Sequence, residues 1–436
     1  MSSKLSFGRL SDLTVPNVGV QTGPFGSQLH QEDYVPEGTP IITVEHMGEN
    51  RILHENLPRV SDADKNRLNK YHLQAGDIVF SRVGSVDRRA LVRDAENGWL
   101  FSGRCLRVRA DPDILDATYL SYFFGLEGFK KYIRGVAVGA TMPSINTQIL
   151  SELPIYYPPL PIQRQIAAIL SAFDDKIELN RQMNRTLEQM ARALFKSWFV
   201  DFDPVRAKMR GEQPEGMDAA TAALFPSELV EVDGREVPKG WEIKGLDEIA
   251  DFLNGLALQK FPPTGENDLP VIKIAQLRKG NTEGSGFAAR TVGEKYIVKD
   301  GDILFSWSGS LEVVRWSGGE GALNQHLFKV TSSEYPNWFI FWWLLEHLPE
   351  FQAIAANKAT TMGHIQRKHL NDAKAVLPPK DLLLRLGESI YPLFESMFQN
   401  DQESARLAQL RDALLPRLLS GEVDVSEWAA PQEQGA

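Results

Sequence analysis

Hydroxyl, amide and basic side chains gather in a few short loops of this chain. One loop, residues 20–27, is punctuated by glycine and proline, and another, residues 139–146, is small and rich in hydroxyl groups. Such side chains donate hydrogen bonds to phosphate oxygens or base edges, and arginine binds phosphate or guanine. The residues of these types that could contact phosphate or base edges are Gln21, Ser27, Arg82, Ser85, Arg88, Arg89, Thr141, Ser144, Lys279, Ser308, Ser310, Thr361, His364 and Gln366.

A structural interpretation of the same features stays open. The two Thr-Met loops at Thr141 and Thr361 would then cap the junction between a globular domain and a long helix. Basic clusters suit phosphate contacts, but a single cluster is often only a solvated face. The clusters are Arg82, Arg88, Arg89 and Arg93; Arg104, Arg107 and Arg109; Lys130, Lys131 and Arg134; Arg278 and Lys279; and Arg367 and Lys368.

The net charge of −10 argues against nucleic acid only if the acid is evenly spread. It is not: residues 204–236 carry four basic against seven acidic residues, and residues 378–436 carry five against ten. The remaining segments are close to neutral. The charge distribution is therefore compatible with local contacts to phosphate.

The sequence shows none of the common signatures of a catalytic or cofactor site. It has no G-x-x-x-x-G-K-[ST] phosphate loop, no H-E-x-x-H, and no Asn or Asp followed by two prolines and an aromatic residue. Residues 284–289 match a loose dinucleotide fingerprint, but turn-forming residues precede them instead of a strand. The single Cys105 excludes an internal disulfide and a cysteine-based zinc site. We predict no catalytic residue, no metal and no cofactor in this chain.

Two long amphipathic stretches are the dominant feature of the sequence. Apolar residues recur by threes and fours from Ile162 to Phe199 and again from Leu382 to Leu418, as expected for helices with one apolar face. From Leu187 and Leu407 onward, the two stretches align at a constant offset of 220 residues. Asn180 and Asn400 obey this offset, and a polar residue at such a seam can set helix register. The alternative is that each asparagine is merely tolerated there.

The globular parts of the chain repeat as well. The landmarks of the first half return in order in the second half: a Pro-x-Ile or Pro-Val-Ile strand, a Gly-Asp-Ile-x-Phe-Ser strand, an aromatic helix, a Thr-Met loop and a proline pair. This order predicts an α+β protein with a pseudo-two-fold internal duplication, whose two similar domains are separated by two antiparallel coiled-coil helices. The predicted segments are a first domain (1–157), a long helix (158–203), a connector (204–236), a second domain (237–377), a second long helix (378–420) and a tail (421–436).

Composition places the chain among ordinary soluble proteins. It is 43% hydrophobic and 24% charged, it has no apolar run long enough to span a membrane, and its first residues lack a signal-peptide core. We expect a cytoplasmic protein that does not bind membranes.

The duplicated order resembles the specificity subunit of type I restriction-modification enzymes over essentially the whole chain. The segments that carry the resemblance are residues 23–27, 76–81, 141–146, 194–205 and 238–241, although the first domain lacks the Pro-x-Gly-Trp opening of the second. The resemblance implies two target-recognition domains on double-stranded DNA, each binding half of a split site. It also implies two modification subunits that use S-adenosylmethionine, and restriction subunits that use ATP and Mg.

Two other classes of function remain open at this point. The chain could be a self-contained DNA methyltransferase or nuclease, which the missing cofactor motif disfavours. It could also be a coiled-coil scaffold without a role on DNA. Methyl transfer by the isolated chain would identify the first class, and a band-shift experiment would identify the second.

Overall fold

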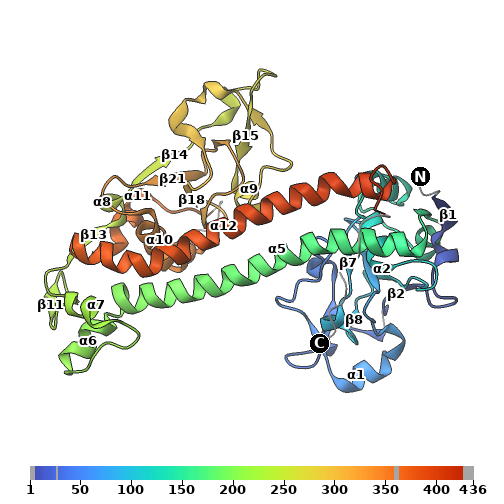
Figure 1. The fold of residues 1–436 in the computed structure, drawn as a ribbon, viewed down its shortest axis with the longest axis horizontal. Helices are drawn as coiled ribbons and strands as arrows, with labels where there is room; N and C mark the ends of the chain where they lie inside the picture. Colours follow the sequence, from blue (N-terminus) through green and yellow to red (C-terminus); the bar gives the residue numbers. More distant parts are fainter. Residues whose placement is uncertain (1–4, 26–27, 358–362, 426–436) are drawn as a thin grey trace. The chain divides into compact units, whose positions relative to one another are not determined.

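The computed structural model describes residues 5–25, 28–357 and 363–425. The chain forms two compact units, each with both helices and strands (Figure 1). Unit 1 comprises Met1–Asp175 and Leu407–Ala436, and unit 2 comprises Lys176–Arg406. The two long helices, α5 (Leu160–Phe195) and α12 (Lys380–Leu419), each contribute one part to either unit. The fold is thus α+β, as predicted.

Unit 1 holds the first globular domain. Its helices are α1 (Asp62–Arg67), α2 (Ala117–Phe123), α3 (Glu127–Val136) and α4 (Thr147–Ser151), followed by the start of α5. Its strands are β1 (Ser6–Arg9), β2 (Val20–Thr22), β3 (Tyr34–Val35), β4 (Thr39–Ile42), β5 (Arg59–Val60), β6 (Ile78–Ser81), β7 (Arg89–Leu91), β8 (Leu100–Phe101), β9 (Cys105–Val108) and β10 (Pro154–Tyr157).

Unit 2 holds the second domain and the segment that precedes it. Its helices are α6 (Asp203–Met209), α7 (Ala219–Leu224), α8 (Leu246–Ile249), α9 (Ile274–Lys279), α10 (Asn337–Ala356) and α11 (Arg367–Asp372). Its strands are β11 (Leu229–Val232), β12 (Arg235–Pro238), β13 (Glu242–Gly245), β14 (Asp251–Asn254), β15 (Leu269–Ile272), β16 (Phe287–Ala288), β17 (Ile297–Val298), β18 (Ile303–Ser306), β19 (Val313–Arg315), β20 (Gly321–Leu323), β21 (Leu327–Thr331) and β22 (Lys374–Leu377).

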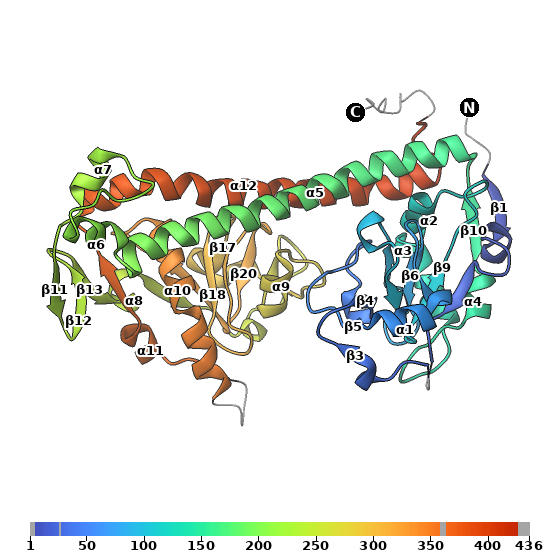
Figure 2. The ribbon, with the colours of Figure 1, turned by 90° about the horizontal axis from the view of Figure 1, so that it is seen from below.

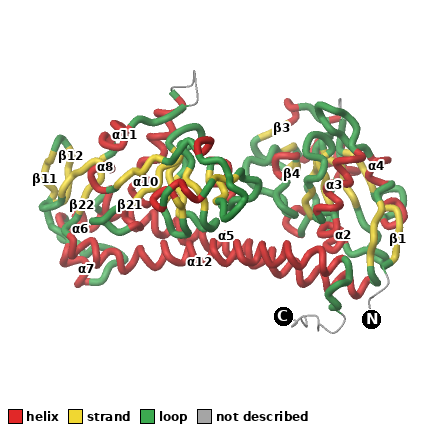
Figure 3. The backbone as a smooth tube through the Cα atoms, turned by 90° about the horizontal axis from the view of Figure 1, so that it is seen from above, coloured by secondary structure: helices red, strands yellow, loops and turns green. Residues whose placement is uncertain are grey.

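The sheets of the two units follow one plan, and Figure 3 shows their strands in yellow. An antiparallel sheet has the order β2-β9-β6-β7 in unit 1 and β14-β21-β18-β19 in unit 2. A mixed sheet contains one parallel pair, β4 with β8 in unit 1 and β15 with β20 in unit 2. A two-stranded sheet, β1-β10 or β13-β22, completes each set. The predicted internal duplication is therefore present in the topology.

The central strands are buried because their sequences are continuous apolar runs. β6 and β18 are fully buried, and each pairs with its neighbour through corresponding residues: Ile78 opposes Val108, and Ile303 opposes Val330. Strands covered on both faces read as unbroken hydrophobic sequence instead of alternating with polar residues. In unit 1, α2, α3 and the beginning of α5 contribute to the same core as β6, and in unit 2 the aromatic helix α10 takes that place.

The long helices run antiparallel where they pair within each unit (Figure 2). In unit 2, Asn184 donates from Nδ2 to the backbone oxygen of Met397, while Asn180 donates to that of Asn400. Higher residue numbers on α5 thus meet lower numbers on α12. The α-helical part of α5 ends at Phe195, and a π-helical turn (Lys196–Val200) follows, so the predicted helix to Phe199 changes type in its last turn. Within the described segments, no helix combines the length and apolarity needed to cross a bilayer.

The segment after α5 is more ordered than a plain connector. It folds into α6, α7 and the β11–β12 hairpin. Phe225 lies in the core of unit 2, where its ring is 6.1 Å from that of Trp241. Lys208 donates to the carbonyl oxygens of Ala222 and Phe225 and so ties α6 to the end of α7.

Candidate nucleic-acid interface

Two of the predicted loops lie against each other in unit 1. Arg82 directly follows β6, and its carbonyl oxygen accepts a hydrogen bond from Ile145 N at 2.9 Å. Gly84 N donates to Pro143 O at 2.8 Å. The loop after β6 and the Thr-Met loop are therefore joined by backbone hydrogen bonds, which fix the mutual position of their side chains.

A third loop joins this group from β2. Gly23 N donates to Cys105 O at 3.2 Å, and a Cβ on Gly23 would collide with the backbone oxygen of Ser102. Only glycine allows this close approach. The loop then presents Phe25, whose ring lies under the guanidinium of Arg82 with 4.4 Å between the ring centroid and Cζ.

Unit 2 builds the same arrangement from different residues. Ile365 N donates to Trp307 O at 3.0 Å, and Gly309 N donates to Gly363 O at 2.8 Å. Gly255 N donates to Leu327 O at 3.0 Å, and a Cβ on Gly255 would meet the backbone of Asn324. The three-loop platform, defined here as the loops after β2, after β6 and before α4 together with their unit 2 counterparts, is thus duplicated.

Several predicted contact residues of unit 1 lie on this platform with accessible side chains. Arg82 and Ser144 are half-buried, while Ser85, Arg88 and Thr141 are exposed. Ser144 Oγ donates to Val138 O, and Arg88 donates to Met47 O. Gln21 is half-buried in β2, two residues before Gly23. Ser27 lies outside the described residues.

The structure corrects the prediction for Arg89. Its side chain is 4% exposed, its Nε donates to Ser121 O, and its Nη1 pairs with Glu49 at 3.2 Å. A guanidinium held in this way is not available to phosphate or guanine, because β7 directs it into the domain. Arg89 therefore has a structural role in the fold.

In the folded unit 1, some arginines of the basic clusters are buried or ion-paired, and others have no carboxylate partner among the described residues. Arg107 is buried and donates to Val18 O, and burial lowers the pKa of Arg107 to about 10. Arg109 forms a two-point ion pair with the buried Asp77, with both contacts at 2.7 Å. Arg93 pairs with Asp175, and Arg134 pairs with Asp87 and Glu127. Within the part of unit 1 that the structure describes, no carboxylate pairs with Arg82, Arg88 or Arg104.

The predicted residues of unit 2 occupy varied positions. Ser308 is 3% exposed, and its hydroxyl is hydrogen-bonded to Nδ1 of His326 at 2.9 Å. It therefore holds the ring of His326 in place instead of presenting its own hydroxyl at the surface. Ser310 and Gln366 are exposed, and His364 is half-buried with its ring 6.3 Å from that of Trp307. Lys279 is exposed at the end of α9, an element separate from the three loops. Thr361 lies outside the described residues.

The platform also contains two residues that were not predicted, Phe25 and Trp307. Arg104, which the sequence analysis named only within a basic cluster, and His326 lie beside it, because their backbone oxygens accept hydrogen bonds from Arg82 N and Trp307 N. Trp307 follows β18 as Arg82 follows β6, and His326 precedes β21 as Arg104 precedes β9. The signal was present in the sequence, because Trp307 stands directly after the repeated Gly-Asp-Ile-x-Phe-Ser strand. Trp307 was not predicted as a contact residue because tryptophan is typical of hydrophobic cores.

The two seam asparagines lie between the long helices. Asn180 is fully buried, and its Nδ2 donates to Glu403 at 2.8 Å and to Ser404 at 3.3 Å. Asn400 donates from Nδ2 to Asn184 Oδ1 at 2.8 Å. Both positions suit the predicted register function, which stays a prediction.

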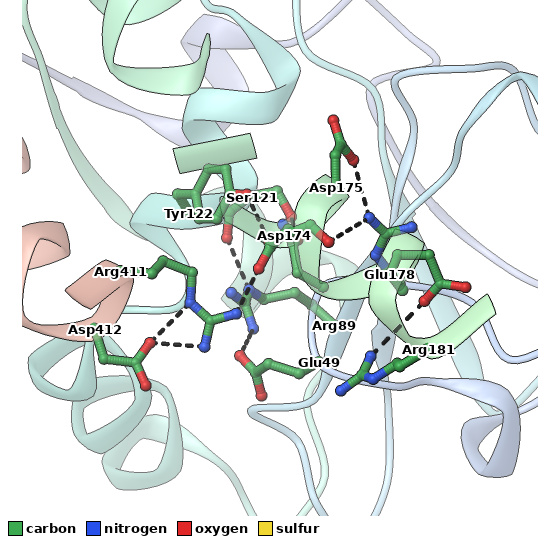
Figure 4. A network of polar contacts seen from close by, with 12 residues as sticks. Glu49, Arg89, Ser121, Tyr122, Asp174, Asp175, Glu178, Arg181, Arg411 and Asp412 are labelled. Carbon is green, nitrogen blue, oxygen red and sulfur yellow. Dashed lines mark hydrogen bonds and ion pairs between the residues drawn. The ribbon is translucent and has the colours of Figure 1, made fainter. Parts of the chain in front are cut away.

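A buried polar network fastens the unit 1 domain to its helices (Figure 4). Asp174 of α5 accepts a hydrogen bond from the hydroxyl of Tyr122 on α2 at 2.6 Å and pairs with Arg411 of α12. Burial opposes the charge of Arg411, but Asp174 outweighs it and raises the pKa of that guanidinium. Burial, strengthened by Asp174, also raises the pKa of Tyr122, which keeps its hydroxyl protonated as a donor.

Nothing in the described ranges gathers three or more histidine, cysteine, aspartate or glutamate side chains that could hold a metal ion. The side chains of the platform can make hydrogen bonds, cationic contacts and aromatic contacts. These are the interactions by which proteins bind nucleic acids.

Comparison with known proteins gave consistent matches. The family model described as type I restriction modification DNA specificity domain matches residues 21–189 and 238–382. The chain is 27% identical over 423 residues to the type I restriction enzyme HindI specificity subunit of Haemophilus influenzae, covering 86% of this chain and 92% of that protein. It is 30% identical over 325 residues to the MjaIX specificity subunit of Methanocaldococcus jannaschii, covering 71% and 69%. A solved S subunit of a type I restriction-modification system from M. genitalium has the same fold, with a TM-score of 0.54, 17% identity and 96% coverage of both chains.

Proposed function

Because this chain belongs to the type I restriction-modification DNA specificity family, we propose that it binds a two-part DNA site and contacts one half with each unit. It is a specificity subunit of that class. The observation that supports two half-sites is the duplicated three-loop platform, built on equivalent strands and joined by equivalent backbone hydrogen bonds. Because the side chains on the two platforms differ, the two half-sites differ in sequence.

The paired segments of α5 and α12 act as a spacer in this proposal. Between Leu170, in the core of unit 1, and Ala191, in the core of unit 2, no residue of α5 belongs to either core, although Ile177 is buried. A helix rises about 1.5 Å per residue, so a stretch of this kind sets a distance in the way that dimer geometry sets half-site spacing elsewhere. The gap between the half-sites then follows from helix length.

The outer faces of the long helices are the docking surface for two modification subunits. Met190 on α5 and Leu410 on α12 stand 220 residues apart in the sequence, and their side chains are 51% and 53% exposed. Exposed apolar residues at equivalent positions of a duplicated chain suit two copies of one partner. Restriction subunits would join the assembly through these partners.

The chain itself is non-catalytic in this proposal. S-adenosylmethionine, ATP and Mg belong to the partner subunits, and the target adenine leaves the base stack in the partner's active site. This chain holds the duplex in place. Purified alone, it should therefore transfer no methyl group to DNA, whereas the complex with the modification subunit should do so.

The experiment is a map of methylated adenines in a host with and without this gene, with the modification gene present in both. We expect a two-part motif that disappears with the gene. A motif that persists without this chain would refute the proposal, and so would methylation at a single continuous site.

A further inference from the structure

The residue that follows the central strand differs in chemistry between the two platforms. In unit 1 it is Arg82, and in unit 2 it is Trp307. The two are structurally equivalent: each accepts a backbone hydrogen bond from the isoleucine before α4 or α11, at 2.9 and 3.0 Å. Each also donates from its backbone nitrogen to the residue before the neighbouring strand, Arg104 or His326.

Arg82 is presented as a preorganised donor. Phe25 supports the guanidinium from one face at 4.4 Å, which limits its rotation. Among the described residues, its side chain makes one hydrogen bond, from Nη1 to Gly103 O, which is long at 3.5 Å. Most of its N–H groups are therefore left for a ligand, and a planar guanidinium matches the O6 and N7 acceptors of guanine.

Trp307 is presented as an apolar group. Its Nε1 already donates to Asn254 Oδ1 at 2.9 Å, so its polar atom is used within the protein. The half-buried ring stands among His326, Phe328 and His364, with centroid separations of 5.9 to 6.3 Å. What remains accessible of the indole is its carbon surface. In a DNA groove, such a surface matches the methyl group of thymine.

Building on the proposed function, we propose that Arg82 and Trp307 are corresponding base-contacting positions, with guanine as the target of Arg82 and thymine as the target of Trp307. Arg104, which is exposed next to Arg82, contacts the neighbouring phosphate. His326, the counterpart of Arg104, does not offer its Nδ1 to a phosphate, because this atom is hydrogen-bonded to the hydroxyl of Ser308. In this proposal the half-site of unit 1 is bound through the guanidinium groups of Arg82 and Arg104, and the half-site of unit 2 is bound through the indole ring of Trp307.

The test is a map of methylated adenines in a host that carries the modification gene and variants of this full-length chain. Arg82→Trp should remove the guanine preference at one position of one half-site, by about ten- to a hundredfold in methylation of that base over its competitors. Trp307→Arg should change one position of the other half-site from thymine to guanine. The milder variants Arg82→Lys and Trp307→Phe guard against misfolding: lysine should weaken the guanine preference, and phenylalanine should keep the thymine.

Matched controls lie off the platform. Arg59→Trp and Trp99→Arg alter the same residue types in unit 1 and should leave both half-sites unchanged. If Arg82 and Trp307 variants that still methylate kept the wild-type motif, the assignment would be overturned, and likewise if both altered the same half-site. A wild-type map without any two-part motif would instead refute the proposed function.

Discussion

Asp174 and Arg411 form a buried ion pair between α5 and α12 in unit 1, with side chains only 5% and 15% exposed. Tyr122 of α2 completes the group by donating to the same carboxylate. The counterparts of these three residues at the offset of 220 are Phe394, Ala191 and Trp342, which are all buried in unit 2. One half of the chain therefore uses a polar junction where the other uses an apolar one.

Replacing Asp174 by Ala should destabilise unit 1 by about 3 kcal/mol, the low end for a broken buried ion pair, because Arg411 would keep only the exposed Asp412 as a partner. Thermal or urea unfolding monitored by hydrogen exchange in α2 and α5 would measure the loss. Adding Arg411→Ala to this variant should recover part of it. Glu188→Ala, which breaks an exposed pair with Arg192, should cost at most about 1 kcal/mol. An equal effect of the two single variants would contradict the assignment of a buried pair.

Cys105 should be inert in the native protein. It is fully buried beside Ser102 and Ile42, and burial raises the pKa of its thiol to about 12 from an ordinary 9. At pH 8 the native chain should therefore react with a disulfide reagent orders of magnitude more slowly than the unfolded chain. Because the folded state retains the thiol proton, this group should also favour unfolding as the pH rises above 9. Rapid stoichiometric labelling of the native chain would contradict this.

The two seam asparagines should lower the stability of the helix pair while fixing the alignment of α5 with α12. Asn180 is buried, and its Oδ1 has no hydrogen-bond partner among the described residues, so Asn180→Leu together with Asn400→Leu should raise the melting temperature. The same change should loosen the helix alignment. Spin labels at Arg192 and Glu388 would report a shifted or broadened distance distribution. An unchanged distribution would show that the asparagines do not set the register.

The helices and the duplication could be predicted from the sequence because both leave a periodic record. A stripe such as Leu187, Met190 and Leu194 identifies a helix without knowledge of its neighbours, and a repeated strand identifies its counterpart. The platform was only partly predictable. The buried state of Arg89 and the pairing of Arg109 with Asp77 depend on which way a strand turns its side chains and on residues distant in sequence.

Lengthening the spacer should move the half-sites apart without altering them. Because the helices pair antiparallel, residues 181–187 and 397–403 lie opposite each other, and duplicating both segments keeps the pairing. Seven residues add about 10 Å, which corresponds to at most about 3 base pairs. Mapping of methylated adenines would measure the new gap. Duplication in α5 alone should abolish methylation, and altered half-site bases in the double duplication would contradict the spacer function.

The measurement that bears most directly on the two-unit account is exchange of one domain. Residues 1–157 would be replaced by the corresponding domain of another family member within the full-length chain, and methylated adenines would be mapped in a host that carries the modification gene. The account predicts that one half-site changes to that of the donor while the other half-site stays the same. A methylating chimera in which both half-sites change, or neither, would contradict it.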